Sequence, residues 1–324
     1  MALLPLIERW ITERPPDFVF EVNESGLAYA SPAAAGAPVS EAVPPASLVP
    51  SPSSQNVLNP EGFRAALTRI APNGSVRKPT AALVLPDYAV RMAILDFDQW
   101  PDDEAQRMSL VRFRLRKSVP FAIEEAQVSY SIQGRPAAAT GGGSGQTEIL
   151  AVAMDQRILK EYESIFTDFG FRVGLVMPSG VACLSLFPDV DSVAGSAPLS
   201  LLLKLSGAIL TVLLLEGDAI RLVRCVDFTE PAAVDPEAEE RAPARPFSAV
   251  DDTLPVLTQT LAYAEDEIGH RVDRLILSGF GEATSEVGSV AESEFQLPWD
   301  VLHSRFAPAQ TYAGLLGLLE RYAA

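Results

Sequence analysis

The chain has 324 residues, 48% of them hydrophobic, and a formal net charge of −17. This length and apolar content predict a large core and two domains, whereas the negative charge argues against binding to nucleic acid and against broad adhesion to anionic lipid. His270 and His303 have no metal-ligand spacing with each other or with the cysteines, so no metal centre is predicted. Cys183 and Cys225 stand in apolar surroundings without a CxxC motif, which favours buried free thiols.

Residues 1–16 are predicted to form a short amphipathic helix. The segment lacks the positive start and the small-residue cleavage site of a signal peptide. A helix of about three turns is marginal alone, so we expect it to dock on the body of the protein or to contact the inner leaflet of a membrane or another protein. The residues of its apolar face are Leu3, Leu4, Ile7, Trp10 and Ile11.

Strands and helices alternate from residue 17 to residue 187. Asn59 and Pro60 are typical of a helix start, and the acidic beginning and basic end of 101–118 suit the dipole of a helix. The predicted elements are a strand pair over 17–30 with a turn at 23–26, a helix over 60–71, strands over 80–86 and 90–97, a helix over 101–118, strands over 127–132 and 148–154, a helix over 155–169, a strand over 172–178 and a helix over 179–187.

The most apolar stretch, residues 199–226, predicts a meander rather than a membrane span. Lys204 and Glu216 lie within it, and a spanning helix needs about 20 consecutive apolar residues. Turn-forming pairs with glycine divide the stretch into pieces of strand length. The elements predicted from here on are strands over 199–205, 208–215 and 219–226, a helix over about 250–269, a strand over 274–279 and helices over 283–294 and 309–322.

Three low-complexity segments interrupt these elements, at 31–54, 134–147 and 229–247. They are rich in proline, alanine, glycine or serine, and the third contains the acidic run at 235–240, which is expected to be solvated. Such composition predicts extended or mobile surface loops. Because long loops without structure are uncommon in compact domains, we expect them to be disordered or to hold a partner.

Two units that each open with a meander and continue with helices are the plan of the actin-like (ribonuclease H-like) ATPase fold. Four segments, at 110–132, 148–187, 273–284 and 310–321, resemble in the same order the corresponding segments of the type IV pilus assembly PilM family. The resemblance covers almost the whole chain. It implies an α/β protein with a first domain over 17–187, a small α/β subdomain inserted at about 87–147, and a second domain over 188–324.

In the PilM family, the first turn of each unit cradles nucleotide phosphates with backbone amides beside a glycine, and an acidic residue helps to hold the metal. The first unit here reads "FEVNESG". Glu21 keeps the acid and Ser25 is retained, but Asn23 replaces the glycine. The lysine that the family carries a few residues later corresponds to Ala28.

The second unit, "LKLSGAILT", departs further from that pattern. Lys204 stands at the acid and Ser206 at the glycine, while Gly207 and Thr211 lie one position late. A lysine cannot coordinate magnesium, on which phosphoryl transfer depends. Three interpretations of Lys204 are left open: it extends from a strand end to solvent, it binds a phosphate without metal, or it contacts a partner.

The third turn, "LSGFGE", keeps Gly279 and Gly281 but inserts Phe280 between them. Together the three turns predict a degenerate nucleotide site and a pseudo-ATPase, with no catalytic residue to name. We expect no cofactor, and ATP is the alternative. The candidate site comprises Glu21, Asn23, Ser25, Lys204, Ser206, Gly207, Thr211, Gly279 and Gly281.

A basic run, "RFRLRK", lies at 112–117. Arg112 and Arg116 are four residues apart and share a helix face, whereas Phe113 is expected to pack. A solvated helix end is one interpretation of these arginines. The alternative is a basic rim for an acidic partner or a neighbouring copy of the chain, to which the following Pro120 and Phe121 would contribute.

The resemblance implies a cytoplasmic scaffold of the type IV pilus machine, associated peripherally with the inner membrane through its partners. The family binds the N-terminal cytoplasmic peptide of a PilN-type inner-membrane protein in a groove beside the inserted subdomain. The pilus assembly motor ATPase and further copies of the chain are the other partners considered. Two alternatives are an active ATP-binding actin-like switch and a GspL-like cytoplasmic component of type II secretion. A GspL-type protein continues into a membrane span, whereas this chain ends at Ala324 without one.

Overall fold

The computed structural model describes residues 15–34, 36–71, 78–133, 147–187, 197–229, 246–308 and 311–322. The predicted N-terminal helix lies almost entirely outside these ranges, as do most of the loops predicted at 134–147 and 229–247. Among the described residues, no helix is both long and apolar enough to cross a membrane.

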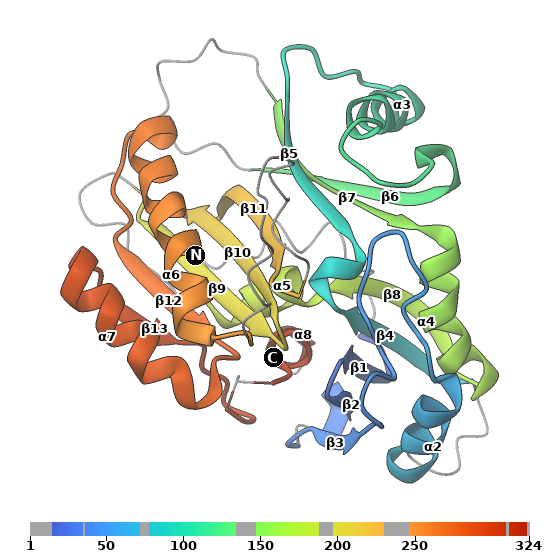
Figure 1. The fold of residues 1–324 in the computed structure, drawn as a ribbon. Helices are drawn as coiled ribbons and strands as arrows, with labels where there is room; N and C mark the ends of the chain where they lie inside the picture. Colours follow the sequence, from blue (N-terminus) through green and yellow to red (C-terminus); the bar gives the residue numbers. More distant parts are fainter. Residues whose placement is uncertain are drawn as a thin grey trace, which may run out of the picture.

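Two five-stranded sheets with the same plan form the two halves of the molecule (Figure 1). The first sheet contains β1 (Phe18–Asn23), β2 (Gly26–Ala30), β3 (Val39–Ala42), β4 (Thr80–Leu85) and β8 (Arg172–Pro178), and the second contains β9 (Leu199–Ser206), β10 (Ile209–Glu216), β11 (Ala219–Asp227), β12 (Arg274–Ser278) and β13 (Trp299–Val301). Their orders are β3-β2-β1-β4-β8 and β11-β10-β9-β12-β13. Each sheet joins an antiparallel meander to two parallel strands. This repetition confirms the two units predicted from the sequence.

A third, smaller sheet belongs to the unit inserted into the first half. Its strands are β5 (Arg91–Phe97), β6 (Ala126–Ile132) and β7 (Thr147–Asp155), in the antiparallel order β5-β7-β6. Helix α3 (Glu104–Leu115) packs on this sheet and forms with it a separate small core around Val111, Leu115 and Ile149. Asp103 caps α3 by accepting a hydrogen bond from the amide of Gln106 at 2.9 Å.

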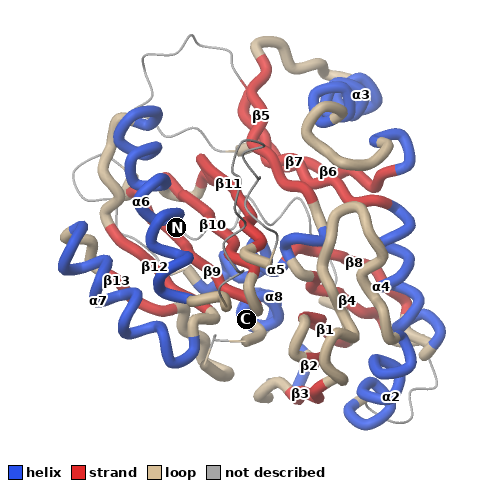
Figure 2. Tube along the Cα trace, viewed as in Figure 1, coloured by secondary structure: helices blue, strands red, loops and turns tan. Residues whose placement is uncertain are grey.

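The other helices cover both large sheets in layers (Figure 2). They are α2 (Pro60–Ile70), α4 (Gln156–Asp168), α5 (Ser179–Ala182), α6 (Ala249–Tyr263), α7 (Thr284–Phe295) and α8 (Ala313–Tyr322). Helices α2 and α4 lie on the outer face of the first sheet, and α6 and α7 lie on the outer face of the second. Helices α5 and α8 lie between the sheets, so a continuous core joins the two halves.

The alternation of side chains along β9 decides which residues face the other half. Leu201, Leu203 and Leu205 point into the core beneath α6 and α7. Because successive side chains on a strand point to opposite faces, Leu202 and Lys204 point toward the first sheet. Leu202 accordingly belongs to the core shared by both halves.

Helix α8 comes last in the sequence but packs against the first sheet. Two glycines allow its backbone to approach α5 closely. A Cβ atom added to Gly314 would lie 2.8 Å from the hydroxyl oxygen of Ser179, and one added to Gly317 would lie 2.1 Å from the carbonyl oxygen of Ala182. Leu315 and Leu319 then fill the core between the sheets.

The segment 31–54, predicted as an extended or mobile loop, contains an ordered strand, and that prediction was wrong for this part. Strand β3 pairs with the outer edge of β2, and Gly26 permits the pairing because an added Cβ would lie 2.2 Å from the carbonyl oxygen of Glu41. The side-chain nitrogen of Asn56 donates to the carbonyl oxygens of Ser51 and Ser54, at 2.7 Å each. These bonds fix a segment whose composition alone indicates disorder.

Three smaller differences concern the ends of elements and one side chain. Helix α3 begins three residues later than predicted, because Asp103 is its cap rather than part of its first turn. Strand β13 was not predicted, since three residues are too few to show a period. Phe113 was expected to pack, but it is 69% exposed on α3.

Candidate functional site

The carboxyl ends of three parallel strands bring polar groups together at one edge of the first sheet, which is where α/β proteins commonly bind ligands. Glu21 lies near the end of β1, Asp87 follows β4, and Ser179 and Gly180 follow β8. Lys204 reaches this edge from β9 of the second sheet. The candidate site is therefore the place where the two sheets meet, which we call the cleft.

Asp87 is the centre of this cluster and is only 3% exposed. One carboxylate oxygen, Oδ1, accepts a hydrogen bond from the amide of Gly180 at 2.6 Å. The other, Oδ2, accepts from the hydroxyl of Thr211 at 2.8 Å and from the Nζ atom of Lys204 at 3.2 Å. The lack of a side chain at Gly180 eases this approach, since an added Cβ would lie 3.1 Å from Oδ2 and in tight contact with it.

Glu21 is equally buried and is held by two donors. The hydroxyl of Ser179 donates to Oε1 at 2.5 Å, and the backbone amide of Leu315 in α8 donates to Oε2 at 2.7 Å. Burial raises the pKa of Glu21 to about 6, although the Lys204 charge and both hydrogen bonds act against the increase.

The structure contradicts one of the three interpretations of Lys204, and the other two stay predictions. Its side chain does not extend to solvent, because the residue is 6% exposed. Burial lowers the pKa of its ammonium group, but the nearby carboxylates of Asp87 and Glu21 more than offset this effect, so the pKa is raised overall. Lys204 is thus a buried cation paired with Asp87 across the cleft, an interpretation that the sequence did not indicate.

The residues of the first predicted turn bond mainly to one another. The side-chain oxygen of Asn23 accepts from the amides of Ser25 and Gly26, at 2.9 and 3.1 Å, and its side-chain nitrogen donates to the carbonyl oxygen of Thr311 at 3.1 Å. Asn23 therefore closes the β1–β2 turn and ties it to the segment before α8. Ser25 bonds through its backbone, donating its amide to Asn23 and accepting from the amide of Val43.

The second predicted turn faces the first across the cleft. The hydroxyl of Ser206 donates to Oε2 of Glu24 at 2.8 Å. Gly207 has a φ angle of +56°, which allows the tight β9–β10 turn. Glu24 and Asp87 were not singled out from the sequence, although each lies next to a predicted strand end.

The third predicted turn follows β12, whose Ser278 pairs with Lys204 in the second sheet. Gly279 and Gly281 have φ angles of +84° and +54°, so the backbone turns sharply on both sides of Phe280. The Phe280 ring is buried in the core beneath α6 and α7. The inserted phenylalanine therefore packs inside the second half rather than entering the cleft.

No described group of three or more histidine, cysteine, aspartate or glutamate residues is arranged to hold a metal ion. Cys183 and Cys225 are free, as predicted, but only Cys183 is fully buried and Cys225 is half-buried. Burial raises the pKa of Cys225 to about 12 and raises that of Cys183 as well. Both thiols are therefore weak nucleophiles at neutral pH.

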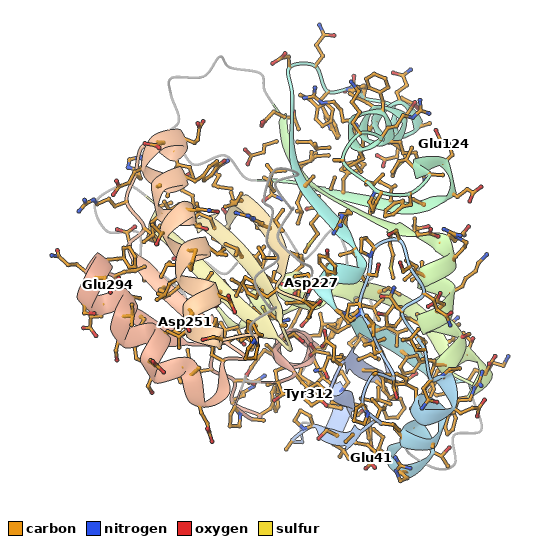
Figure 3. All side chains as sticks on the ribbon, viewed as in Figure 1. Glu41, Glu124, Asp227, Asp251, Glu294 and Tyr312 are labelled. Atoms are coloured by element: carbon orange, nitrogen blue, oxygen red, sulfur yellow. The ribbon has the colours of Figure 1, made fainter. Side chains whose placement is uncertain are left out.

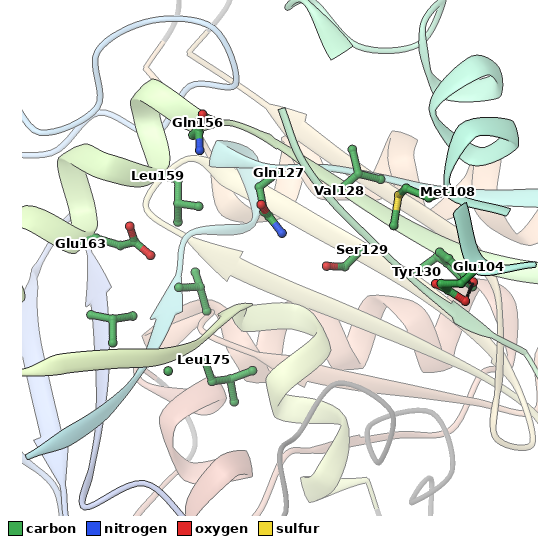
Figure 4. Close-up of a pocket in the computed structure, with 13 residues that line it drawn as sticks. Glu104, Met108, Gln127, Val128, Ser129, Tyr130, Gln156, Leu159, Glu163 and Leu175 are labelled. Atoms are coloured by element: carbon green, nitrogen blue, oxygen red, sulfur yellow. Dashed lines mark hydrogen bonds between the residues drawn. The ribbon is translucent and has the colours of Figure 1, made fainter. Parts of the chain in front are cut away.

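A groove of about 630 Å³ lies away from the cleft, between the first sheet and the inserted unit (Figure 4). Strand β8 is an edge strand of the first sheet and β6 is an edge strand of the inserted sheet. The groove therefore lies along two strand edges. The lining residues are Glu104, Met108, Gln127, Val128, Ser129, Tyr130, Gln156, Leu159, Glu163, Val173, Gly174, Leu175 and Val176.

Acidic groups lie at both ends of the groove. Glu163 extends from α4 at one end, and Glu104 lies beside Tyr130 at the other. The hydroxyl of Tyr130 bonds to the Glu104 carboxylate at 2.9 Å. Burial raises the pKa of Glu163, although the charge of Lys160 acts against it. Glu163 makes no hydrogen bond or ion pair among the contacts described, so it is available to a ligand.

A smaller apolar recess of about 60 Å³ shares part of this lining. Gln127, Ser129, Leu159 and Val176 line both the recess and the groove. A water molecule needs roughly 10–15 Å³ of such space, so the recess has room for about four heavy atoms. Its other lining residues are Leu85, Val90, Val152, Met154, Met177 and Pro178.

The residues predicted to bind a partner belong to the inserted unit but do not line the groove. Arg112 donates to the carbonyl oxygens of Ile123 and Ala126, the latter at 3.0 Å, and so fixes the turn before β6. Arg116 pairs with Glu124 on the surface (Figure 3). Pro120 is exposed and Phe121 packs on the small core. Their role in partner binding stays a prediction.

No protein-family model and no curated protein sequence matches this chain. Among solved structures, the PilM–PilN type IV pilus biogenesis complex contains a chain that is 15% identical, with a TM-score of 0.66 over 96% of this chain and 99% of that one. A Bacteroides thetaiotaomicron protein with an actin-like ATPase fold is 9% identical, with a TM-score of 0.50 over 93% and 94% of the two chains. The cytoplasmic domain of EpsL, an inner-membrane component of the Vibrio cholerae type II secretion system, is 12% identical, with a TM-score of 0.44 over 94% and 93%. The first two likenesses confirm the predicted fold: the chain has the actin-like ATPase fold.

Proposed function

We propose that this protein is a cytoplasmic scaffold of a type IV pilus machine that binds the N-terminal peptide of a PilN-type inner-membrane protein. It is held at the inner membrane by that peptide and passes the state of the assembly motor to the membrane complex. Self-association would let several peptides be held side by side. The observation that carries the proposal is the groove between β6 and β8, in a fold that matches a chain of the PilM–PilN complex over almost its full length.

The backbone along the groove suits an extended peptide. The outer edges of β6 and β8 have no neighbouring strand among the described residues, and such edges readily accept an added strand. β8 has seven residues, so a peptide of similar length would cover it at about 3.3 Å per residue. An irregularity in the pairing with β4 leaves Gly174 without a partner.

The side chains of the groove indicate which peptide fits. The recess has the size of one aliphatic side chain of four carbon atoms, such as leucine or isoleucine. Glu163 favours a cationic group at one end of the peptide, whereas Glu104 at the other end already has Arg107 3.6 Å away. An extended peptide with a central aliphatic residue and a flanking arginine, lysine or amino terminus therefore matches the groove.

The interdomain cleft supports a scaffold rather than an ATPase. ATP is the ligand that the fold family implies, and its phosphates would need a metal held by acidic groups. Here the acidic groups, Glu21 and Asp87, already have a cation beside them in Lys204. Asn23 closes its own turn and Thr211 is bonded to Asp87. These residues do not fit a magnesium–phosphate group, which supports a decayed nucleotide site.

The test is a titration of the full chain with a fluorescent synthetic peptide that carries the N-terminal cytoplasmic sequence of PilN. We expect saturable binding in the absence of ATP. Gly174→Trp should fill the groove, because an added Cβ there meets no atom within 4 Å, and should weaken binding at least about tenfold, or 1.4 kcal/mol.

The matched control is Gly36→Trp. Gly36 lies before β3, at the opposite edge of the first sheet, and an added Cβ would meet only the Ala34 carbonyl oxygen at 3.9 Å. Gly36→Trp should bind the peptide with the same affinity as the unsubstituted protein. Equal binding of the peptide by both variants would exclude the groove as its binding site. No binding by the unsubstituted protein would exclude the PilN peptide as a partner. Tight magnesium-dependent binding of ATP in a parallel titration would contradict the scaffold function and favour an ATP-binding actin-like switch.

A further inference from the structure

Within the described ranges, three side-chain hydrogen bonds connect the two sheets across the cleft. Lys204 and Thr211 of the second sheet both bond to Asp87 of the first, at 3.2 and 2.8 Å. Ser206 bonds to Glu24 at 2.8 Å. Lys204, Thr211 and Asp87 are each at most 6% exposed. The cleft is therefore closed by the chain's own side chains.

We propose that Lys204 is a built-in cation that clamps the two halves of the protein in one closed arrangement. The inference rests on the proposed loss of nucleotide binding from the cleft, but it does not depend on the peptide groove. In this interpretation, Lys204 provides the positive charge that the two carboxylates would otherwise need from a bound ligand.

A covalently attached cation differs from a ligand in one physical respect. A ligand stabilises the closed state only in proportion to its concentration relative to its dissociation constant. The Lys204 ammonium is always present, so closure would not depend on any solute. The domain angle is then a fixed property of the fold rather than a response to ATP.

The geometry favours a single closed arrangement. Asp87 has its two oxygens oriented by three donors from three elements, namely Gly180, Thr211 and Lys204. Sliding one sheet against the other would separate at least two of these donors from the carboxylate and leave charge unpaired in a buried place. Buried polar groups of this kind can specify one arrangement even where they add little net stability.

The clamp also holds one wall of the recess. Leu85 and Val90 line the recess and flank the turn that carries Asp87. Met177 and Pro178, also in the lining, immediately precede Ser179 and Gly180. The closed cleft thereby keeps the floor of the groove in place in the absence of a ligand.

The test measures the distance between the two halves of the full chain by pulsed electron resonance. Spin labels are attached at Ala65→Cys on α2 and Ser289→Cys on α7, both exposed positions. The protein without engineered cysteines serves as the blank for labelling of Cys183 and Cys225. We expect one narrow distance distribution, unchanged by ATP with magnesium.

Lys204→Met keeps an unbranched side chain, shorter by one atom, but removes its charge, so the distribution should broaden and shift to longer distances. Lys117→Met, on the exposed end of the inserted unit, is the matched control and should change nothing. Thr211→Val removes one donor to Asp87 without leaving an unpaired charge, and it should broaden the distribution less. If Lys204→Met does not fold, the distance distribution of Thr211→Val tests the clamp in its place.

Distances in folded Lys204→Met and Thr211→Val that equal those of the unsubstituted protein would overturn the clamp. A distribution that narrows or shortens when ATP and magnesium are added to the unsubstituted protein would overturn it as well. If the distances behave as expected but the PilN peptide does not bind, the scaffold function fails while the clamp stands.

Discussion

Lys204→Met should be among the most destabilising substitutions in the chain, and its cost can be worked out from the structure. The substitution leaves Asp87 buried without its cation, 3.2 Å from where the Nζ atom lay. At that separation and an effective dielectric constant of about 20, the attraction is about 5 kcal/mol. Desolvation of the ammonium offsets part of this energy, so we expect a loss of about 3–5 kcal/mol in the free energy of unfolding.

The assay is urea unfolding of single and double variants at pH 7.5, followed by circular dichroism. Asp87→Asn alone should also be destabilising, because Lys204 then lacks its counter-charge. The double variant should cost at least about 2 kcal/mol less than the sum of the single variants, since it leaves neither charge unpaired. Lys117→Met should stay within about 0.5 kcal/mol of the unsubstituted protein.

Two outcomes would refute this reasoning. A loss below about 1 kcal/mol in Lys204→Met would mean that water or a rearranged side chain replaces the ammonium group. Strict additivity of Lys204→Met and Asp87→Asn would mean that the two residues act independently, despite their contact.

Three further predictions concern the same region. The pKa of Glu21 rises to about 6 on folding from an ordinary value of 4.5. The stability that this shift contributes, about 2 kcal/mol, is complete below pH 4.5 and is lost as the pH rises through 6. Urea unfolding between pH 4.5 and 7 should show this loss, and Glu21→Gln should remove it. Gly317→Ala should destabilise by at least about 1–3 kcal/mol in thermal unfolding, because the new Cβ would lie 2.1 Å from the carbonyl oxygen of Ala182. Cys183 and Cys225 should react with a thiol reagent at pH 8 only after unfolding in urea, because burial raises the pKa of both.

Each of these predictions has a clear contrary result. The same pH slope in Glu21→Gln would assign the proton uptake to another acidic group, because the neighbours Lys204, Cys183 and Tyr312 all have pKa values raised above this pH range. A stability gain in Gly317→Ala, as expected for an exposed helix position, would mean that α8 does not approach α5 closely. Rapid labelling of native protein would mean that the core around the thiols opens easily.

Most of the fold could be predicted because its elements carry local signals. The three strands over 199–226 were predicted to within about one residue, since turn pairs with glycine divide runs of leucine, isoleucine and valine. Asn59 caps α2 as expected, accepting from the amide of Gly62 at 2.9 Å. Strand β3 was missed because its order depends on a partner strand and on Gly26, and its own composition points the other way.

The candidate site was harder to predict because its contacts are not local. The sequence drew attention to Lys204, but its partner Asp87 lies 117 residues away and belongs to no motif. The alternation along β9 fixes that Lys204 and Leu202 share a face, yet only the packing of the second sheet against the first shows what that face meets. The groove is similar, since β6 and β8 meet at it only after the inserted unit has folded back on the first sheet.

The position of α8 has a consequence for how the protein is made. The ribosome adds Leu315 of α8 294 residues after Glu21 of β1, yet α8 completes the core of the sheet to which β1 belongs. Glu21 must also wait for the amide of Leu315 before its second oxygen is bonded. Domains commonly fold in order as they emerge, but here the first half remains incomplete until α8 has been made, so its unfinished core has to be kept from aggregating while the second half is translated.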